Sequence, residues 1–440
     1  MGRTWRLETI RSIIILGVVL SLAGTAWGKY SGGSGEPNNP YRIATPNDLN
    51  DIGNHPNDWD KHFVMTDDIN LVDYNGTSFK LIGYWENWYD ADNVPFVGVF
   101  DGNGHTISNF TYAMPAHNGV GLFTYLGSGG KIMNLGLANV DVNAPGRYCV
   151  GGLVAFSKGA VSNCWADGNV RAGRYVAVLV SYGGRRSVIS DCLVRGRVSG
   201  TNYPVGGLVS GNEDVVSACG SHVKAQGVDS VGSLVGENYW TIRDCFATGD
   251  VQGSSQIGGL VGYNTGSIDR SWASGDVSGY FASGGLVGEN NDEIRDCYAV
   301  GDVNGDNDCT GGLIGRNYYH VYHCYAAGRV TGAGNLGGFA GVAYSLSEFQ
   351  SCFWNQDANP TLDGIAGGSD PNVIGISTAQ MQTESTFTDA GWDFVDVWDI
   401  GEGQTYPFLR VHSAGDLNHD GVVDWRDFGI LAGHWLEGAG

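Results

Sequence analysis

The residues best suited to chemistry by type and spacing form an acidic loop near the end of the 440-residue sequence. Oxygen-bearing groups stand at loop positions 1, 3, 5, 7, 9 and 12, and Gly421 stands at position 6. These groups are Asp416, Asn418, Asp420, the carbonyl of Val422, Asp424 and Asp427. Calcium binds about six to eight oxygen ligands around a sharp turn, which is what this spacing supplies. The sequence therefore predicts a calcium site; the alternative is an acidic turn before an amphipathic helix over 425–436.

Nine cysteines are a second candidate set, as metal ligands or nucleophiles. Seven recur at one position of a repeated unit, whereas Cys149 and Cys309 each stand two residues before a unit begins. The seven are Cys164, Cys192, Cys219, Cys245, Cys297, Cys324 and Cys352. The sequence has no Cys-x-x-Cys pair to hold zinc, and free cysteine packs like a small hydrophobic residue. We interpret the seven as a buried column, with disulfides between adjacent units as an alternative in an exported protein.

Aromatic side chains stand directly after this column and form the candidate ligand-binding set. The set comprises Trp165, Phe246, Trp272, Tyr298, Tyr325 and Phe353. Because side chains alternate along a strand, inward-pointing cysteines would place these rings on one outer strip. We favour a ladder in which the rings stack on one another. The alternative is a strip that stacks sugar rings or receives a protein partner.

Charged side chains form further groups. Asp250, Asp276 and Asp302 recur on one face, where we expect a solvated acidic surface rather than a calcium site. We interpret His105 and Asp101, in a glycine turn, as structural rather than as an acid–base pair. The least regular units contain six arginines, which are Arg171, Arg174, Arg185, Arg186, Arg195 and Arg197. We expect these arginines to offset the negative charge of neighbouring aspartates and glutamates. The alternative is a patch that binds an acidic polysaccharide.

A repeated unit contains all of these residues except the acidic loop and the turn with Asp101 and His105. The string Gly-Gly-Leu-Val, or a close variant, recurs at intervals of 26 to 29 residues, starting at Gly151, Ala177, Gly206, Gly232, Gly258, Gly284, Gly311 and Gly337. Each unit has three short β-type segments bounded by glycine or polar residues, predicted as strands over 285–288, 294–299 and 302–304 in the unit at Gly284. Such a unit buries its apolar side only by stacking on its neighbours, which predicts a parallel β-helix with three strands per turn.

An asparagine recurs six residues after the start of five consecutive units. The column is Asn212, Asn238, Asn264, Asn290 and Asn317. Asparagine tolerates positive φ, and stacked amides bond to one another. We therefore expect these residues to occupy a turn with positive φ and to form a ladder.

The two ends lack the repeat. Residues 1–28 have the arginine-containing head, short apolar run and small exit residues of a signal peptide. Residues 29–118 are expected to form an N-terminal cap and the first turns, with Thr45 and Pro46 starting a short helix over the open end. Residues 119–355 form the repeat, and the aromatic residues of 356–412 are expected to close the other end. Residues 413–440 contain the acidic loop.

The composition excludes several classes of protein. Glycine accounts for 71 residues, which disfavours a helical bundle, and 42% hydrophobic residues are too many for a disordered chain. A net charge of −22 argues against a nucleic-acid or anionic-membrane partner. The apolar run of the predicted signal peptide has no counterpart later in the sequence, so we expect an exported mature chain with no membrane span.

Two resemblances carry further expectations. The string Gly-Gly-Leu-Val-Gly-x-Asn, at 258–264 and 284–290, resembles the GLUG motif of exported bacterial repeat proteins. Together with residues 101–107, this repeat is similar to the pectate-lyase-type β-helix superfamily, which implies a right-handed coil. Residues 415–436 resemble one dockerin type I repeat, which implies calcium ligands at Asp416, Asn418, Asp420, Asp424 and Asp427 and a cohesin-like domain as a partner. Dockerins carry two such repeats, whereas one is seen here, and Trp425 and Arg426 stand where small hydroxyl residues are usual.

Together these features predict a secreted, right-handed parallel β-helix that binds polysaccharide or a cell-surface protein in an adhesin-like manner, with a calcium-binding tail for attachment. Enzymes need a cluster of acid–base groups, and on a repeat scaffold such a cluster would break the regularity seen here. No catalytic residue is therefore assigned. The alternative function is a polysaccharide lyase or glycoside hydrolase acting on acidic polysaccharide.

Overall fold

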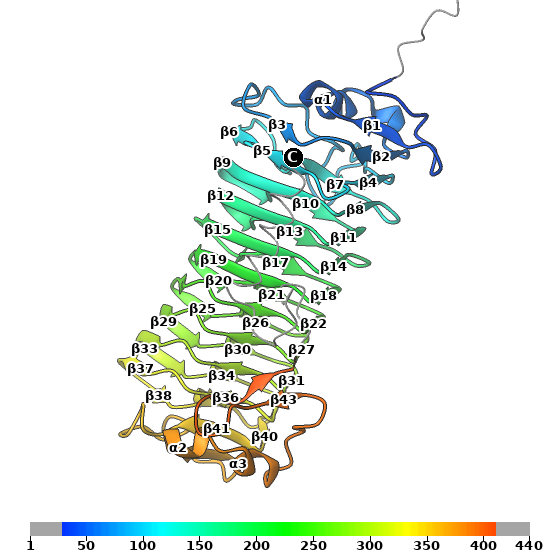
Figure 1. The fold of residues 1–440 in the computed structure, drawn as a ribbon. Coiled ribbons are helices and arrows are strands. Elements are labelled where there is room, and N and C mark those ends of the chain that lie inside the picture. Colours follow the sequence, from blue (N-terminus) through cyan, green and yellow to red (C-terminus); the bar gives the residue numbers. More distant parts are fainter. Residues whose placement is uncertain (1–28, 411–440) are drawn as a thin grey trace, which may run out of the picture.

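A computed structural model describes residues 29–410 of the chain, which wind into a parallel β-solenoid (Figure 1). The predicted signal peptide and the predicted calcium loop lie outside the described residues. Strands of successive turns pair in parallel, so that three sheets run along the molecule. The predicted all-β class and three-stranded turn are confirmed. None of the helices within 29–410 is both long and apolar enough to cross a membrane.

The first sheet has 12 strands, each of which pairs with the equivalent strand one turn away. Its middle residues form the buried aliphatic and aromatic column Ile132, Val161, Ile189, Val216, Ile242, Ile268, Ile294, Val321 and Phe349. The strands are β1 (Tyr41–Ile43), β2 (His62–Met65), β4 (Val99–Asp101), β8 (Lys131–Met133), β11 (Ala160–Ser162), β14 (Val188–Ser190), β18 (Val215–Ser217), β22 (Thr241–Arg243), β27 (Ser267–Asp269), β31 (Ile294–Arg295), β35 (His320–Tyr322) and β40 (Glu348–Gln350).

The second sheet has nine strands, which follow the Gly-Gly-Leu-Val strings. They are β7 (Phe123–Leu126), β10 (Val154–Ser157), β13 (Val180–Gly183), β17 (Val209–Asn212), β21 (Val235–Asn238), β26 (Val261–Asn264), β30 (Val287–Asn290), β34 (Ile314–Asn317) and β39 (Ala340–Ala343). The paired glycines have a packing reason. A Cβ on Gly258 would lie 1.9 Å from the Val261 carbonyl oxygen, and one on Gly259 would lie 2.1 Å from that of Gly285.

The third sheet contains the remaining parallel strands and bends part-way across each turn. Its strands are β3 (Ile69–Asn70), β5 (Thr106–Ser108), β6 (Thr111–Ala113), β9 (Gly136–Val150), β12 (Trp165–Val176), β15 (Leu193–Gly200), β16 (Val205–Gly206), β19 (Gly220–Gln226), β20 (Asp229–Gly232), β23 (Phe246–Ala247), β24 (Val251–Gln252), β25 (Ser255–Gly258), β28 (Trp272–Ala273), β29 (Val277–Gly284), β32 (Tyr298–Ala299), β33 (Val303–Gly311), β36 (Tyr325–Ala326), β37 (Val330–Gly332), β38 (Leu336–Gly337), β41 (Cys352–Asn355) and β42 (Val373–Ile376).

A sharp corner separates the first sheet from the third, and it corrects one expectation. The segment 294–299, predicted as one strand, is divided between β31 and β32 because Asp296 adopts φ 50°. Equivalent residues of other turns, such as Asp244 and His323, also have positive φ. The cysteine column follows this corner directly. The asparagine column, for which positive φ was expected, ends the strands of the second sheet and is not in the left-handed region.

Different segments cover the two ends of the solenoid (Figure 1). Helix α1 (Pro46–Asn54) begins after Thr45 with a capping box and buries Leu49 and Ile52 in the main core, as predicted. A 3₁₀ turn, η1 (Pro56–Asp58), follows it. At the other end Trp354, Ile365 and Val373 complete the main core.

The aromatic closing segment lies elsewhere than expected. Residues 377–410 comprise the helices α2 (Thr378–Met381) and α3 (Glu384–Thr388) and the antiparallel strands β43 (Trp398–Asp399) and β44 (Phe408–Leu409). They form a second hydrophobic cluster against Tyr298, Tyr325 and Phe353. The segment therefore continues past the end of the solenoid and folds back along its side.

Candidate functional site

The predicted ligand-binding set includes a stacked ladder of rings. The ring centroids of Phe246 and Trp272 are 5.2 Å apart, those of Trp272 and Tyr298 5.6 Å, and those of Tyr298 and Tyr325 5.0 Å, with interplanar angles of 15° or less. Each pair stands in register on adjacent turns of the third sheet. These rings therefore form the stacked ladder that we favoured, and the ladder lies on the third sheet.

The folded-back segment covers much of this ladder. The Tyr325 hydroxyl donates to the Pro407 carbonyl at 2.6 Å, and Trp398 Nε1 donates to Asp296 at 3.2 Å. Phe246, Tyr298, Tyr325 and Phe353 are each less than 9% exposed. Of the six rings, only those of Trp165 and Trp272 keep partial exposure. Ligand binding by this strip stays a prediction, and these two tryptophans are its accessible part.

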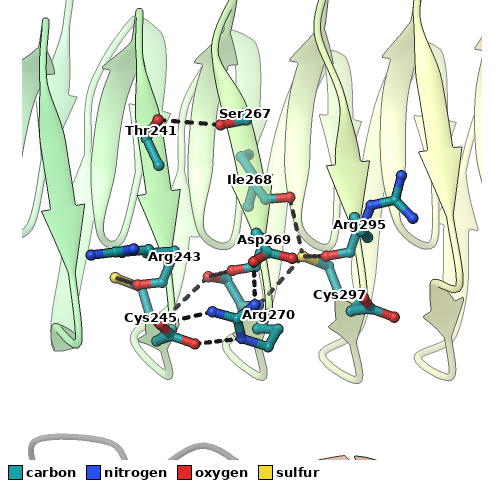
Figure 2. A network of polar contacts seen from close by, with 12 residues as sticks. Thr241, Arg243, Cys245, Ser267, Ile268, Asp269, Arg270, Arg295 and Cys297 are labelled. Carbon is teal, nitrogen blue, oxygen red and sulfur yellow. Dashed lines mark hydrogen bonds and ion pairs between the residues drawn. The ribbon is translucent and has the colours of Figure 1, made fainter. Parts of the chain in front are cut away.

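The cysteine column lies at the corner of each turn and is buried (Figure 2). Each Sγ lies 3.0–3.5 Å from the carbonyl oxygen two residues before it. Ser271 replaces the thiol in one turn, and its hydroxyl makes the same contact at 2.8 Å. All nine cysteines are free, and burial raises the pKa of Cys352 to about 12. The column has the structural role that was expected.

The charged columns are also satisfied within the fold. Asp276 accepts from the backbone N–H of Asp302 at 3.0 Å, and Asp302 from that of Arg329 at 2.8 Å. Arg270 binds both carboxylate oxygens of Asp244, at 2.7 and 3.1 Å (Figure 2). Within the described part of the chain, no three His, Cys, Asp or Glu side chains converge as metal ligands would.

The predicted structural role of the turn at Asp101 is consistent with its contacts. Asp101 Oδ1 accepts from the side chain of Asn134 at 2.9 Å and from the backbone of Asn103 at 2.8 Å. His105 Nδ1 lies 3.3 Å from Asp68 instead. His105 and Asp101 therefore have separate partners.

A cleft of aromatic rings lies where the loop 83–94 crosses the outer face of the second sheet. Two adjoining hollows of about 490 and 400 Å³ share Trp88 and Tyr175 in their walls. The loop is closed by two backbone hydrogen bonds between Tyr84 and Val94, of 2.8 and 2.9 Å. Its Trp85 is buried against Phe156, with ring centroids 5.6 Å apart, and so anchors the loop to β10.

Trp88 is the central ring of this cleft. Its centroid lies 4.9 Å from that of Phe156, 4.7 Å from Tyr182 and 6.1 Å from Tyr175, in each case at a steep angle. Phe156 and Tyr182 are register partners on β10 and β13, which fixes their spacing. Trp88 nevertheless keeps 41% of its surface exposed, and Tyr89 keeps 94%. The site is a rigid, partly open aromatic wall, the kind of surface that holds the apolar face of a small ligand.

Polar groups stand around these rings. The Tyr182 hydroxyl donates to Glu213 at 2.8 Å, and burial together with that carboxylate raises the pKa of Tyr182, so the phenol stays protonated. The guanidinium of Arg174 lies 4.6 Å from the Tyr175 ring and 4.7 Å from the Tyr203 ring. Lys158 Nζ lies 5.4 Å from the ring of Phe156. The structure thus separates the predicted arginine patch: Arg174 and Arg185 line the cleft, and the other four do not.

The cleft could not be predicted from the period because its residues do not repeat. The outward column of the second sheet reads Tyr125, Phe156, Tyr182, Gly211, Glu237, Tyr263 and Glu289 along successive turns, so rings on consecutive turns occur only in its first part. Trp88 belongs to the segment before the repeat, and only the fold brings it to β10 and β13. The density of aromatic residues in 84–89 was the one available signal.

The regular turns match a known family. Residues 227–252, 253–278, 279–304 and 306–331 match the description "The GLUG motif". These four turns are GLUG repeats. They lie on the C-terminal side of the cleft in sequence, and the cleft-lining residues stop at Glu213. The resemblance seen in the sequence is therefore confirmed for these four turns, which do not include the cleft-lining residues.

Two relatives match this chain over a small part of their own length. Halomucin of Haloquadratum walsbyi is 33% identical over 164 residues, which are 36% of this chain and 2% of that protein. A candidate Gly-rich membrane protein of Evansella cellulosilytica is 32% identical over 139 residues, 30% of this chain and 15% of that protein. A solved structure of a candidate immunoglobulin A1 protease from Bacteroides ovatus aligns over 87% of this chain and 96% of its own, with 17% identity and a TM-score of 0.37.

Proposed function

We propose that this protein is exported and binds polysaccharide at a cell surface, in an adhesin-like manner, through the cleft around Trp88. The exposed ring of Trp88, held rigidly over β10 and β13, is the observation that carries the proposal. Sugar rings present an apolar face and a polar edge, and the cleft offers aromatic walls with polar groups at their rim. The names of the relatives, halomucin and a membrane protein, agree with a surface location.

The cleft favours binding over cleavage. Glycoside hydrolysis uses two carboxyl groups that flank the scissile bond. Among the described residues that line the cleft, Glu213 is the single carboxylate, and it already accepts hydrogen bonds from Tyr182 and the Arg185 amide. The alternative function, a lyase or hydrolase on the same scaffold, requires shortened products when the purified protein is incubated with the polysaccharide it binds.

The substitution Trp88→Ala tests the proposed function. We expect it to abolish retention of the protein on the polysaccharides that bind the wild type in affinity electrophoresis, because the central ring of the cleft is lost. The matched control is Trp240→Ala, which removes a ring that is 60% exposed but stands outside the cleft lining. Equal retention of wild type and Trp88→Ala would move the binding site elsewhere, with Trp272→Ala as the next variant to measure.

We further propose that the tail binds one calcium ion and attaches the protein to a cohesin-like partner. The support is the ligand spacing from Asp416 to Asp427, which lies outside the described residues. Replacing Asp416 by Ala should weaken calcium binding to the full chain by about tenfold or more in titration calorimetry, because a charged ligand is lost. Asp396→Ala, an exposed carboxylate outside the loop, is the control. Unchanged calcium binding by Asp416→Ala would refute the site.

A further inference from the structure

We infer that the polysaccharide bound in the cleft is anionic, carrying carboxylate or sulfate groups. This inference rests on the proposed function and adds the chemical class of the ligand. It starts from the charge of the cleft, which is opposite to that of the molecule. The chain has 24 lysines and arginines against 46 acidic residues, whereas the cleft is lined by one carboxylate, Glu213, and by four cations, Arg147, Lys158, Arg174 and Arg185.

None of these four cations forms an ion pair within residues 29–410, where every ion pair of a lysine or arginine involves some other residue. Of the sixteen other lysines and arginines in this range, at least seven form ion pairs, as Lys224 does with Asp250 at 2.7 Å. Four cations without an ion pair at one place give the cleft a positive potential that attracts an anion.

Arg174 is the best positioned of the four. Its guanidinium lies close to the rings of both Tyr175 and Tyr203, and it donates a hydrogen bond to the Tyr175 hydroxyl at 2.9 Å. Its Nε is buried and has no hydrogen-bond acceptor among the described residues. A guanidinium offers two parallel donors that match the oxygens of a carboxylate or a sulfate. The planar group is thus pre-oriented by stacking at the wall of the cleft.

The other cations are arranged so that their charges stay available. Arg147 uses its Nε to donate to the Pro115 carbonyl at 3.0 Å, which fixes the side chain without neutralising it. Lys158 lies over the ring of Phe156, and Arg185 is exposed at the rim beside Glu213. Because Arg147 and Arg174 line one hollow and Lys158 and Arg185 the other, an anion can be bound on each side of Trp88. This arrangement suits a polymer that repeats its negative charge rather than a single small anion.

The test compares charged and neutral forms of the same polymers on the full-length protein. Polygalacturonate is paired with its methyl ester, and dextran sulfate with dextran, in titration calorimetry at two salt concentrations. We expect binding to a charged member and at least about tenfold weaker binding to its neutral partner, with affinity falling as salt rises. Arg174→Gln should weaken binding about tenfold, the effect of one charge-assisted contact. Lys158→Gln, which removes a cation from the other hollow, should also weaken it.

The control is Arg197→Gln, which makes the same change in net charge at an exposed position outside the cleft. It should bind as the wild type does. Equal weakening by Arg174→Gln and Arg197→Gln, or equal affinity for charged and neutral polymers, would overturn the anionic ligand while leaving a polysaccharide-binding cleft in place. Binding to none of the four polymers would contradict the anionic ligand. The proposed function would also be contradicted if, in addition, wild type and Trp88→Ala were retained equally on some other polysaccharide.

Discussion

At the scale of single residues, the solenoid accepts polar side chains in its interior where an equivalent residue one turn away satisfies them. Asn212, Asn238, Asn264, Asn290 and Asn317 are fully buried, and the Nδ2 of each of the first four donates to the Oδ1 of the next at 2.8 or 2.9 Å. Most of these amides also donate to the carbonyl two residues ahead, at 2.7–3.1 Å, which holds the turn that leaves the second sheet. The ladder therefore links adjacent turns and shapes each of them.

Removing one amide from the middle of this ladder should be costly. Asn264→Ala deletes two inter-turn hydrogen bonds and leaves its neighbours Asn238 and Asn290 with buried polar atoms that lose a partner. We expect the free energy of unfolding to fall by about 2–3 kcal/mol, measured by urea unfolding followed by circular dichroism. Asn169→Ala, at an exposed position, should change it by less than about 0.5 kcal/mol. Similar effects of the two substitutions would contradict a stabilising ladder.

The ladder was predictable and its backbone geometry was not. Identical amides at one period must stack once the turns stack, so the hydrogen bonds follow from the sequence. The residues with positive φ vary in type, because the corner before the cysteine column is occupied by Asp244, Arg270, Asp296 and His323 in successive turns. Aspartate and histidine tolerate the left-handed conformation better than most residues, whereas at Arg270 the path of the coil imposes it.

At the scale of elements, two segments without the repeat determine which surfaces stay open. The loop 83–94 crosses the second sheet and makes the cleft, and the segment 377–410 lies against the aromatic ladder and closes it. Neither has register partners on neighbouring turns, so their positions depend on contacts between residues far apart in sequence, such as Trp398 with Asp296 or Trp88 with Tyr182. The aromatic residues of the C-terminal segment indicated that it packs on the solenoid, but not on which face.

The position of the C-terminal segment leads to a prediction about its attachment. Trp398 is fully buried and its ring centroid lies 4.5 Å from that of Trp392 and 6.1 Å from that of Tyr298. Trp398→Ala should remove about 3–5 kcal/mol of packing energy and release residues 377–410 from the solenoid. Limited proteolysis should then cut this segment first while the repeat stays intact. Val395→Ala, in the same segment but 82% exposed, should be as resistant as the wild type; equal cutting of both variants would contradict the proposed anchor.

At the scale of the whole molecule, the regular and irregular turns differ in what they can do. The GLUG turns from 227 to 331 repeat the same columns, whose polar groups bond to neighbouring turns. The earlier turns depart from the repeat and carry the cleft and its cations. The fold was predictable because it depends on periodicity alone, whereas the cleft depends on the few residues that break the period. We therefore infer that the repeat serves as a rigid support and the irregular turns as the binding region.

The most direct test of this account is hydrogen exchange of the full-length protein, measured by mass spectrometry with and without polygalacturonate or dextran sulfate. The prediction is slower exchange in the bound state over the peptides that contain 84–94, 146–148, 173–176 and 201–203, with the GLUG turns unchanged. Slower exchange confined to the turns between 227 and 331, or spread evenly along the solenoid, would contradict the assignment of the ligand to the cleft.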